Sequence, residues 1–283
     1  MRLLASDIDG TILCPGPDGR PGQISERTIA AFGAAADAGI LVVLVTGRPI
    51  RWLDPIREAL GHNGLIIAFN GAVVYDLGAE RVVHSSAMAL ETMFEVRRSI
   101  IQLEPRVHFA AETLTDLYVD THGLDLEETA FPVPDILPQP FEDSLLADDE
   151  IVKLLAKTRH HGADDFWQAV HAKVGAHVAV TRSAPEMTLV EISAKDVHKA
   201  NTLARFAAEH GIAAEDVVAF GDMPNDIEML SWAGTSYAMA SGHKLAIQAA
   251  SHVAPACGDD GVAQVVEYFL RWGVLPTSTQ LEL

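Results

Sequence analysis

The sequence predicts an α/β protein with a Rossmann-like parallel-sheet core and a smaller inserted α+β domain. Short continuous apolar runs alternate with helical patterns, which is typical of a parallel sheet covered on both faces. This rhythm breaks near residue 72 and resumes near residue 197. The chain has 283 residues, enough for about two domains at roughly 150 residues each. We therefore expect the core at 1–80 and 191–283 and the inserted domain at 81–190.

The first half of the core is expected to contain three apolar strands, at 3–5, 41–45 and 65–69. Ser25 can cap a helix that Gly39 ends. Pro49 can occupy the first turn of a second helix, which ends near Gly61.

The pattern changes at a hairpin expected over 72–84, where Val73 and Tyr75 alternate with other residues before a turn at Leu77-Gly78. The inserted domain is expected to start at residue 81, within this hairpin. It is expected to continue with helices over 88–103, 149–160 and 164–173, strands over 107–111, 117–119, 177–181 and 187–192, and a proline-spaced loop over 132–140. The core then resumes with a helix over 197–210, a strand over 216–220, a helix over 224–232 and further units at 236–239, 244–250 and 262–272.

The charge balance excludes one large class of function. The chain has 39 acidic and 20 basic residues, for a formal charge of −19, so it lacks the overall basic balance of a protein that binds nucleic acid by neutralising phosphates. The longest aliphatic run, 40–45, is far shorter than the roughly 18 residues of a membrane span. A reducing cytoplasm is the expected location, and Cys14 and Cys257 fit it, although two cysteines can also form one bridge.

Carboxylates follow the first predicted strand. Asp7 and Asp9 are two residues apart in an extended segment, so both side chains can point to the carboxyl end of the strand, where open α/β sheets bind ligands. The second strand ends in Thr46-Gly47-Arg48, which brings a hydroxyl to the same edge.

The second half of the core adds further polar groups. Lys199 is expected in the first turn of its helix, and the strand at 216–220 is followed by Asp222, Asn225 and Asp226. Two carboxylates 4 Å apart repel each other by roughly 4 kcal/mol at an effective dielectric constant near 20. Positive charge is therefore required, and an all-oxygen ligand set favours Mg²⁺ over zinc. Mg²⁺, an ammonium and hydroxyl donors describe a phosphoryl site, where a carboxylate can act as the nucleophile.

The chain resembles the haloacid dehalogenase-like hydrolases, and within them the Cof-type phosphatases, which carry a large cap after the third core strand. The resemblance covers essentially the whole chain. It rests on Asp7-x-Asp9-Gly10-Thr11, Thr46-Gly47-Arg48, Asn70-Gly71-Ala72, Lys199, Gly221-Asp222-x-x-Asn225-Asp226 and Asp260-Gly261-Val262-Ala263. Two positions depart from the family's pattern, Ala200 after the lysine and Ser241-Gly242 after the next strand. Neither removes a catalytic group.

The resemblance implies a role for each matching residue. Asp7 would attack phosphorus and ligate Mg²⁺. Asp9 would protonate the leaving alcohol and then activate water, and its carbonyl would bind the metal. Lys199 would restrain Asp7 and hold phosphoryl oxygens together with Thr46.

The remaining matches concern the metal and the substrate. Asp222 would ligate Mg²⁺ with Asp226 behind it, and Asn225 would bond to phosphate. The inserted α+β domain would be the cap that sets substrate specificity, helped by Gly47, Arg48 and Asn70 at the core edge. Surface or turn roles for Arg48 and Asn70 stay open, as does a helix-terminus role for Asp226.

The expected activity is Mg²⁺-dependent hydrolysis of a small phosphorylated metabolite, above all a sugar phosphate, through an aspartyl-phosphate. No nucleic-acid or membrane partner is expected, and the oligomeric state is open. A phosphomutase shares the chemistry, and a non-catalytic phosphometabolite-binding protein shares the fold, although such a binder has no need of Asp9. A receiver-like regulatory domain also uses clustered aspartates, but it needs only about half of this chain.

Overall fold

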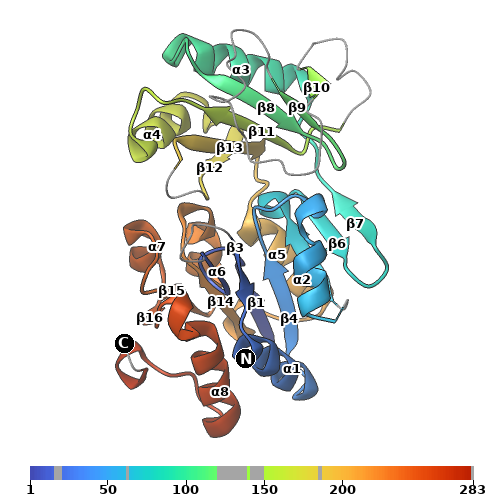
Figure 1. Ribbon diagram of the computed structural model, residues 1–283, viewed down its shortest axis with the longest axis vertical. Helices are drawn as coiled ribbons and strands as arrows, with labels where there is room; N and C mark the ends of the chain where they lie inside the picture. The colour runs from blue at the N-terminus through green and yellow to red at the C-terminus, as the bar shows by residue number, and fades with distance from the viewer. Residues whose placement is uncertain (16–20, 62–63, 120–138, 141–149, 184–186, 282–283) are drawn as a thin grey trace. The chain divides into compact units, whose positions relative to one another are not determined.

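The chain folds into two compact units. The computed structural model describes residues 1–15, 21–61, 64–119, 139–140, 150–183 and 187–281 (Figure 1). The first unit comprises Met1–Arg48, Trp52–His84 and His198–Leu283, and the second comprises Pro49–Arg51 and Ser85–Val197. The sequence-based limits of the inserted domain, 81 and 190, stay a prediction.

The first unit is built on a sheet with eight strands in the described part of the chain, in the order β16-β15-β14-β1-β4-β5-β6-β7. The described strands from β16 to β5 pair in parallel, whereas β6 runs antiparallel to β5. The carboxyl ends of the parallel strands therefore share one edge, as expected. The strands are β1 (Leu3–Ser6), β4 (Leu41–Val45), β5 (Leu65–Ala68), β6 (Val73–Asp76), β7 (Arg81–Ser85), β14 (Val217–Gly221), β15 (Thr235–Met239) and β16 (His252–Ala254).

Helices cover both faces of this sheet, which explains why its central strands are continuously apolar. Side chains from α5, α6 and α7 pack against β1, β4 and β14 in one hydrophobic cluster. The helices α1 and α8 pack on one another and lie on the other face (Figure 1). The helices are α1 (Glu26–Asp37), α2 (Asp54–Ala59), α5 (Lys199–Glu209), α6 (Ile227–Trp232), α7 (Lys244–Ala249) and α8 (Gly261–Trp272).

The local signals for α1 are confirmed. The Ser25 side chain accepts a hydrogen bond from the Thr28 amide at 3.0 Å, which caps the helix. Gly39 follows the helix with a φ of 79°, a backbone conformation that glycine adopts without a steric penalty. The second helix starts later than expected, since Pro49 precedes the short turn η1 (Ile50–Trp52) and Pro55 occupies the first turn of α2.

A small antiparallel hairpin follows β1. It consists of β2 (Leu13–Pro15) and β3 (Pro21–Ile24). A disulfide bond joins Cys14 on β2 to Cys257, which begins the short turn η5 (Cys257–Asp259). The bridge that the cysteine count left open is therefore present in the structure.

The second unit has a mixed sheet with the described strands in the order β10-β9-β8-β11-β13-β12. The helices α3 and α4 pack against one face of it, in a cluster that includes Phe109, Leu154 and Ile192. The elements are α3 (Leu90–Leu103), β8 (His108–Glu112), β9 (Leu117–Val119), β10 (Gln139–Pro140), β11 (Lys153–Lys157), α4 (Ala163–Val174), β12 (Val178–Thr181) and β13 (Leu189–Ala194).

The prediction of a helix over 149–160 is wrong, because β11 occupies the middle of this segment. Its apolar residues are spaced as on a helix, but β11 pairs antiparallel with β8 on one side and β13 on the other. Leu154 and Ala156 face the helices, while Lys153 and Leu155 lie on the opposite side of the sheet. Lys153 is buried between Glu112 and Glu191, at 3.2 and 3.0 Å, a pairing that no local pattern reveals.

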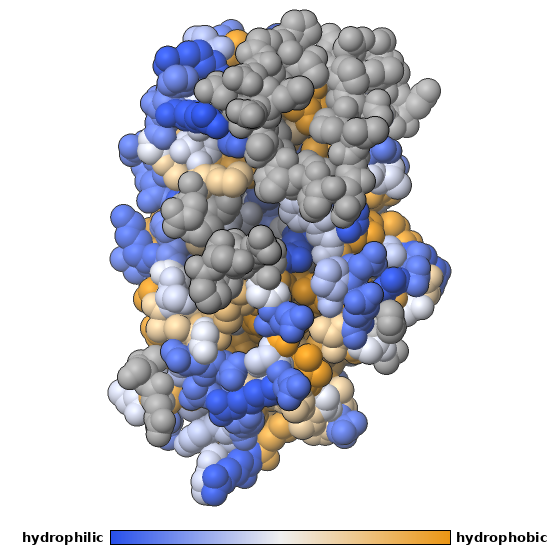
Figure 2. All heavy atoms as spheres, viewed as in Figure 1, coloured by the Kyte–Doolittle hydropathy of each residue, from blue (hydrophilic) through white to orange (hydrophobic). Residues whose placement is uncertain are grey.

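The other expected elements of the inserted domain are confirmed to within about three residues. Most of the expected loop over 132–140 lies outside the described residues. Among the described helices, none combines the length and the apolar character needed to cross a membrane. Hydrophilic and hydrophobic residues are interspersed on the face drawn in Figure 2.

Candidate active site

The first acidic residue of the site follows the central strand β1. The Asp7 amide donates to the Phe220 carbonyl at 3.0 Å, which extends the pairing of β1 with β14 by one residue. Asp7 is buried, with 5% of its surface exposed. The apolar strand β1 thus places one buried carboxylate at the carboxyl edge of the sheet.

The neighbouring strand β14 delivers two more carboxylates through a tight turn. Asp222 follows β14, and the turn η4 (Pro224–Asp226) brings Asp226 back to it. One Asp226 oxygen accepts hydrogen bonds from the amides of Asp222 and Met223, each at 3.0 Å. Gly221 is needed at this turn, because a Cβ there would lie 2.5 Å from the Asp226 side chain.

Lys199 connects these carboxylates. It begins α5, is completely buried, and donates to Asp7 at 2.5 Å and to Asp226 at 2.7 Å. The helix is held in place because Thr202 donates to the Gly71 carbonyl at 2.7 Å. Burial by itself lowers the pKa of Lys199, but Asp226 and Asp7 outweigh that effect and raise the pKa above its ordinary value.

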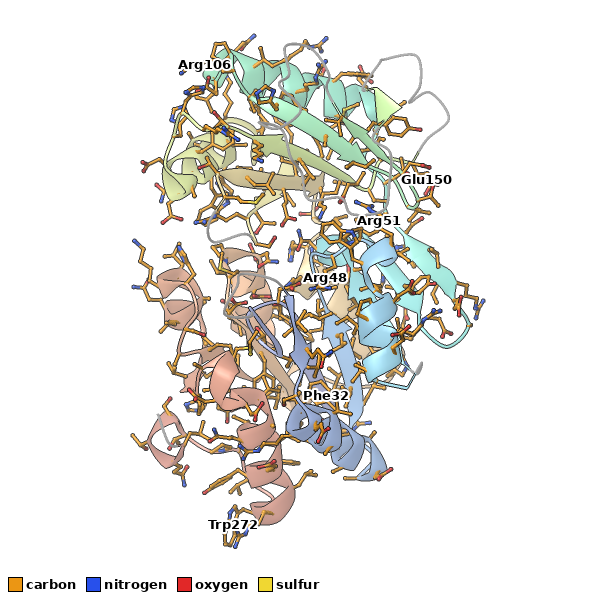
Figure 3. All side chains as sticks on the ribbon, in the orientation of Figure 1. Phe32, Arg48, Arg51, Arg106, Glu150 and Trp272 are labelled. Atoms are coloured by element: carbon orange, nitrogen blue, oxygen red, sulfur yellow. A yellow bond between two sulfur atoms is a disulfide. The ribbon has the colours of Figure 1, made fainter. Side chains whose placement is uncertain are left out.

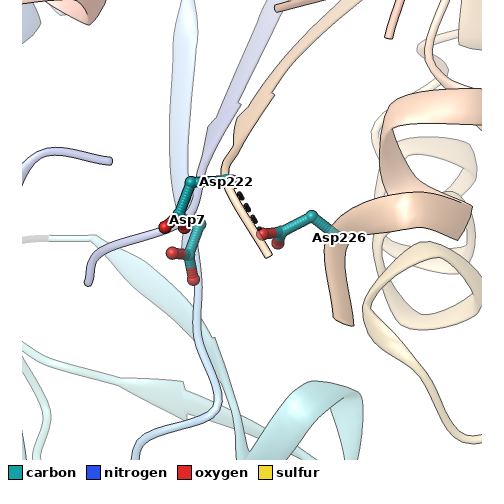
Figure 4. A group of neighbouring side chains, drawn as sticks. All are labelled: Asp7, Asp222 and Asp226. Carbon is teal, nitrogen blue, oxygen red and sulfur yellow. Dashed lines mark hydrogen bonds between the residues drawn. The ribbon is translucent and has the colours of Figure 1, made fainter. Parts of the chain in front are cut away.

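The three carboxylates form a compact cluster (Figure 4). One oxygen from each of Asp7, Asp222 and Asp226 lies within 4.8 Å of the others. Burial raises the pKa of Asp7 to about 7, with Lys199 opposing the shift and Asp226 adding to it. Burial, followed by Asp7 and Asp226, raises the pKa of Asp222 well above its ordinary value. The protein by itself therefore disfavours the charged forms of Asp7 and Asp222.

The cluster fits a hard divalent cation. When all are ionised, Lys199 and the three carboxylates leave an excess of two negative charges, and carboxylate oxygens are the ligands that such cations prefer. Asp226 already accepts from Lys199 with one oxygen and from two amides with the other. Asp7 and Asp222 are therefore the better placed to ligate a metal, with Asp226 holding the turn behind them.

Asp9 is separate from this cluster. Its carboxylate, 53% exposed, forms a two-point ion pair with Arg48, with distances of 2.7 Å to Nε and 2.6 Å to Nη2. Arg48 follows the end of β4 (Figure 3), and its guanidinium also donates to the Trp52 carbonyl at 3.3 Å. The sequence suggested substrate contact or a surface role for Arg48; in the structure it holds Asp9.

The remaining expected residues lie after the ends of β4, β5 and β14. Thr46 is buried and its hydroxyl accepts from the Arg48 amide at 3.1 Å, across Gly47. The Asn225 amide group donates to the Asn70 side chain at 3.0 Å. Asn70 adopts a φ of 55° in the turn η2 (Phe69–Gly71), and its own amide donates to the Thr46 carbonyl.

Two residues near Asp222 were not singled out from the sequence beyond their place in the first motif. Thr11 donates to one Asp222 oxygen at 3.3 Å. Gly10 has a φ of 79°, and a Cβ at this position would lie 2.2 Å from the other Asp222 oxygen. An Asp-Gly pair such as Asp9-Gly10 favours a turn, but only the fold shows that this turn lies against Asp222.

Comparisons with known proteins identify the family of this chain. The family model of the haloacid dehalogenase-like hydrolases matches residues 4–266. The chain is 26% identical over 273 residues to the putative phosphatase YxeH of Bacillus subtilis, covering 94% of this chain and 97% of that one. It is 30% identical over 280 residues to the 5-amino-6-(5-phospho-D-ribitylamino)uracil phosphatase YitU of the same organism, with the same coverage.

The fold is also shared with solved structures. One similar structure, SMU.1108c from Streptococcus mutans, has a TM-score of 0.79 at 22% identity, covering 95% of this chain and 99% of that one. The family model spans nearly the whole chain, and the relatives match over almost their full length. This chain therefore belongs to the haloacid dehalogenase-like hydrolases and is a phosphatase of their Cof type.

Proposed function

We propose that this phosphatase hydrolyses small phosphate monoesters, above all phosphates of sugars and related polyols, through an aspartyl-phosphate on Asp7. The observation that carries the proposal is the buried arrangement in which Lys199 bridges Asp7 and Asp226 beside Asp222. A buried ammonium and clustered carboxylates suit a site where phosphoryl charge must be held while a carboxylate attacks.

Asp7 is the proposed nucleophile. One of its oxygens bonds to Lys199 at 2.5 Å, which restrains the carboxylate and supplies positive charge beside an incoming phosphoryl group. Attack forms an acyl phosphate on Asp7 and releases the alcohol. Water then attacks phosphorus, which frees inorganic phosphate and restores the carboxylate.

Asp9 is the proposed general acid and base. It is two residues from Asp7, more exposed than Asp7, and paired with Arg48. In the first step it gives its proton to the leaving oxygen, and in the second it takes a proton from the attacking water. Arg48 orients the carboxylate between these steps.

The phosphoryl group would be held by Thr46, Gly47 and Asn225, with Lys199. Asn70 would support this set, because it bonds to Asn225 and its amide is tied to the Thr46 carbonyl. Arg48 and Asn70 also lie at the carboxyl edge of the core sheet, where they would contact the alcohol part of the substrate.

We propose Mg²⁺ as the metal, with ligands from Asp7, Asp222 and the Asp9 carbonyl, and with Asp226 behind them. When bound, it would offset the charge of the carboxylates and of the phosphoryl oxygens. The excess negative charge of the cluster and its all-oxygen donors support this assignment.

The substrate class rests on two observations. YitU, the relative at 30% identity, is named for a substrate whose phosphate sits on a ribityl chain. The charge of −19 should disfavour large polyanions such as nucleic acids. The second unit is the proposed cap that selects the alcohol. A cytoplasmic location stays a prediction, which fractionation of cells would test.

The test measures phosphate release from an aryl phosphate and from a panel of sugar and polyol phosphates. We expect Asp7→Asn to lower kcat/KM by at least about 10⁴-fold, because a carboxamide cannot replace the nucleophile. EDTA should abolish wild-type turnover and Mg²⁺ should restore it. The matched control is Asp37→Asn, which changes an exposed aspartate of α1 and should leave kcat/KM unchanged.

The same experiment separates the alternatives. A phosphomutase would return the transferred phosphate to sugar instead of releasing it, so the two products are distinguished by following labelled phosphate. A non-catalytic binder would bind phosphate esters without turnover. Full activity of Asp7→Asn, or turnover in EDTA, would exclude the proposed mechanism, and a ranking headed by an oligonucleotide or phosphoprotein would exclude the substrate class.

A further inference from the structure

The disulfide bond joins two segments that are remote in sequence. Cys14 lies on β2, just after the motif that carries Asp7 and Asp9, and Cys257 lies 243 residues later in η5. Their Cα atoms are 5.7 Å apart, within the range that a disulfide requires. The bond therefore holds the hairpin that follows the catalytic strand against a turn near the C-terminal helix.

Each cysteine is part of a closely packed backbone. A Cβ at Gly22 of β3 would lie 2.4 Å from the Cys14 carbonyl, and one at Gly261 would lie 2.0 Å from the Pro255 carbonyl. The Asp260 amide donates to the Cys257 carbonyl at 3.1 Å. The disulfide therefore connects two ordered segments.

Cys14 directly follows a turn that reaches the metal ligands. Within that turn, the amides of Ile12 and Leu13 donate to the Ile8 carbonyl at 2.9 and 2.8 Å, and the Gly10 amide donates to the Leu13 carbonyl at 3.0 Å. The same turn presents Thr11 to Asp222. The disulfide therefore holds the chain at Cys14, only three residues after Thr11, which contacts the acidic cluster through Asp222.

The two cysteines differ in access. Cys14 is partly exposed, whereas Cys257 is buried, with 7% of its surface exposed. Thiol–disulfide exchange proceeds by attack of a thiolate on an accessible sulfur. Because Cys14 is the more exposed residue, its sulfur is the one at which we place the attack of an external thiol.

We infer that Cys14–Cys257 is a thiol–disulfide exchange site whose redox state controls the order of the turn at Ile8–Leu13, with the oxidised form the more active. Its effect on activity rests on the proposed function. The physical reason is that reduction removes the covalent tie between β2 and η5, so the turn that holds Asp222 loses its attachment on one side.

The reaction balances with a dithiol as reductant. Its thiolate attacks the Cys14 sulfur, which forms a mixed disulfide and releases Cys257 as a thiolate that takes up a proton. The second thiolate of the dithiol then attacks the other sulfur of the same dithiol, the one bonded to Cys14. This releases Cys14 as a thiolate that takes up a proton. The protein disulfide gains two electrons, and the dithiol becomes a cyclic disulfide.

The experiment compares the full-length protein before and after treatment with dithiothreitol. Thiol titration should give no free thiol in the oxidised protein and two in the reduced one. After reduction we expect amide hydrogen exchange in residues 8–14 to accelerate at least about tenfold, and kcat/KM for the aryl phosphate with Mg²⁺ to fall at least about fivefold. Oxidised glutathione should restore both values.

The control is the double variant Cys14→Ser, Cys257→Ser. It should behave like the reduced protein and show no response to dithiothreitol, which separates loss of the bond from any effect of the reagent on the metal. Because the wild type is reduced after it has folded, the test does not depend on the variant folding well.

Two results would overturn the control of the turn, and a third would overturn the control of activity. One is two titratable thiols after treatment with oxidised glutathione. The other is a reduced protein whose exchange in residues 8–14 is unchanged. If no form of the protein releases phosphate, the proposed function fails, but thiol titration and hydrogen exchange still decide whether the disulfide controls the turn. If exchange accelerates on reduction while kcat/KM stays unchanged, control of activity is refuted.

Discussion

The pairing of Arg48 with Asp9 assigns a role to Arg48. From the motif alone, substrate contact and a surface or turn role were both open for this residue. The two contacts, at 2.7 and 2.6 Å, fix the direction of a carboxylate that is half exposed. A bidentate pair constrains orientation more than a single contact does. Arg48 is thus a positioning residue for Asp9, acting through the carboxylate that handles the proton.

We expect Arg48→Gln to affect poor leaving groups more than good ones. A sugar phosphate releases an alkoxide that needs a proton, whereas an aryl phosphate releases a stable phenolate. Loss of general acid catalysis costs about 10² to 10⁴-fold, so kcat on the sugar phosphate should fall by about 10²-fold and that on the aryl phosphate by less than about tenfold. Asp9→Asn should likewise lower kcat more on the sugar phosphate than on the aryl phosphate. Equal losses on both substrates would instead indicate a role in binding.

Gly10 shows how a backbone position supports the same site. It shares a φ of 79° with Gly39, but a Cβ at Gly10 would lie 2.2 Å from Asp222, whereas a Cβ at Gly39 would meet nothing within 4 Å. Both substitutions to alanine impose a left-handed conformation, at a cost of about 1 kcal/mol. Only the first displaces a carboxylate of the cluster.

Gly10→Ala should therefore lower kcat/KM at least about tenfold and weaken Mg²⁺ binding, while Gly39→Ala should lower only the free energy of unfolding. Steady-state kinetics across a Mg²⁺ series, with chemical denaturation of both variants, checks this. Normal Mg²⁺ dependence in Gly10→Ala would show that the turn adjusts without moving Asp222.

At the scale of elements, β11 depends on a buried charge network. Lys153 lies between Glu112 and Glu191, and all three are buried. Burial by itself lowers the pKa of Lys153, but the two glutamates outweigh it and raise the pKa above its ordinary value. Removing the ammonium would take away the positive charge that lies between two buried carboxylates, of which Glu112 also pairs with Arg51 at 2.7 Å.

We expect Lys153→Met to lower the free energy of unfolding by about 3 to 5 kcal/mol, the usual result of removing one member of a buried ion pair. The matched control is Lys157→Met, on the same strand and more exposed, which should change stability by less than about 1 kcal/mol. Urea denaturation followed by circular dichroism measures both. Similar losses in the two variants would mean that strand propensity, rather than the network, determines the effect.

At the scale of the molecule, the carboxylates of Asp7, Asp222 and Asp226 repel one another inside the first unit. A cation that binds only the folded state should relieve this repulsion and stabilise the protein, by about 2.7 kcal/mol at a concentration 100-fold above Kd. Thermal unfolding should therefore shift upward with added Mg²⁺. The shift should be absent in Asp222→Asn, and an equal shift in that variant would place the metal elsewhere.

The sequence by itself determined the parallel core and the positions of its chemistry. Continuous apolar strands and short cap signals are local, so β1, β4 and β14 could be predicted from them. The polar residues that follow these strands had to meet at one edge, because parallel strands share their direction. This is why Asp7, Thr46 and Asp222 could be expected together, whereas the place of Lys199 beside Asp7 was implied by the family resemblance.

Only the tertiary structure decided which groups pair. The strand β11 replaced a predicted helix, since Lys153 is acceptable in a sheet interior only when two distant glutamates neutralise it. The Asp9–Arg48 pair and the Cys14–Cys257 bond likewise join residues 39 and 243 positions apart. Such pairings depend on the meeting of separate segments in three dimensions, and neither propensity nor periodicity along the chain encodes that meeting.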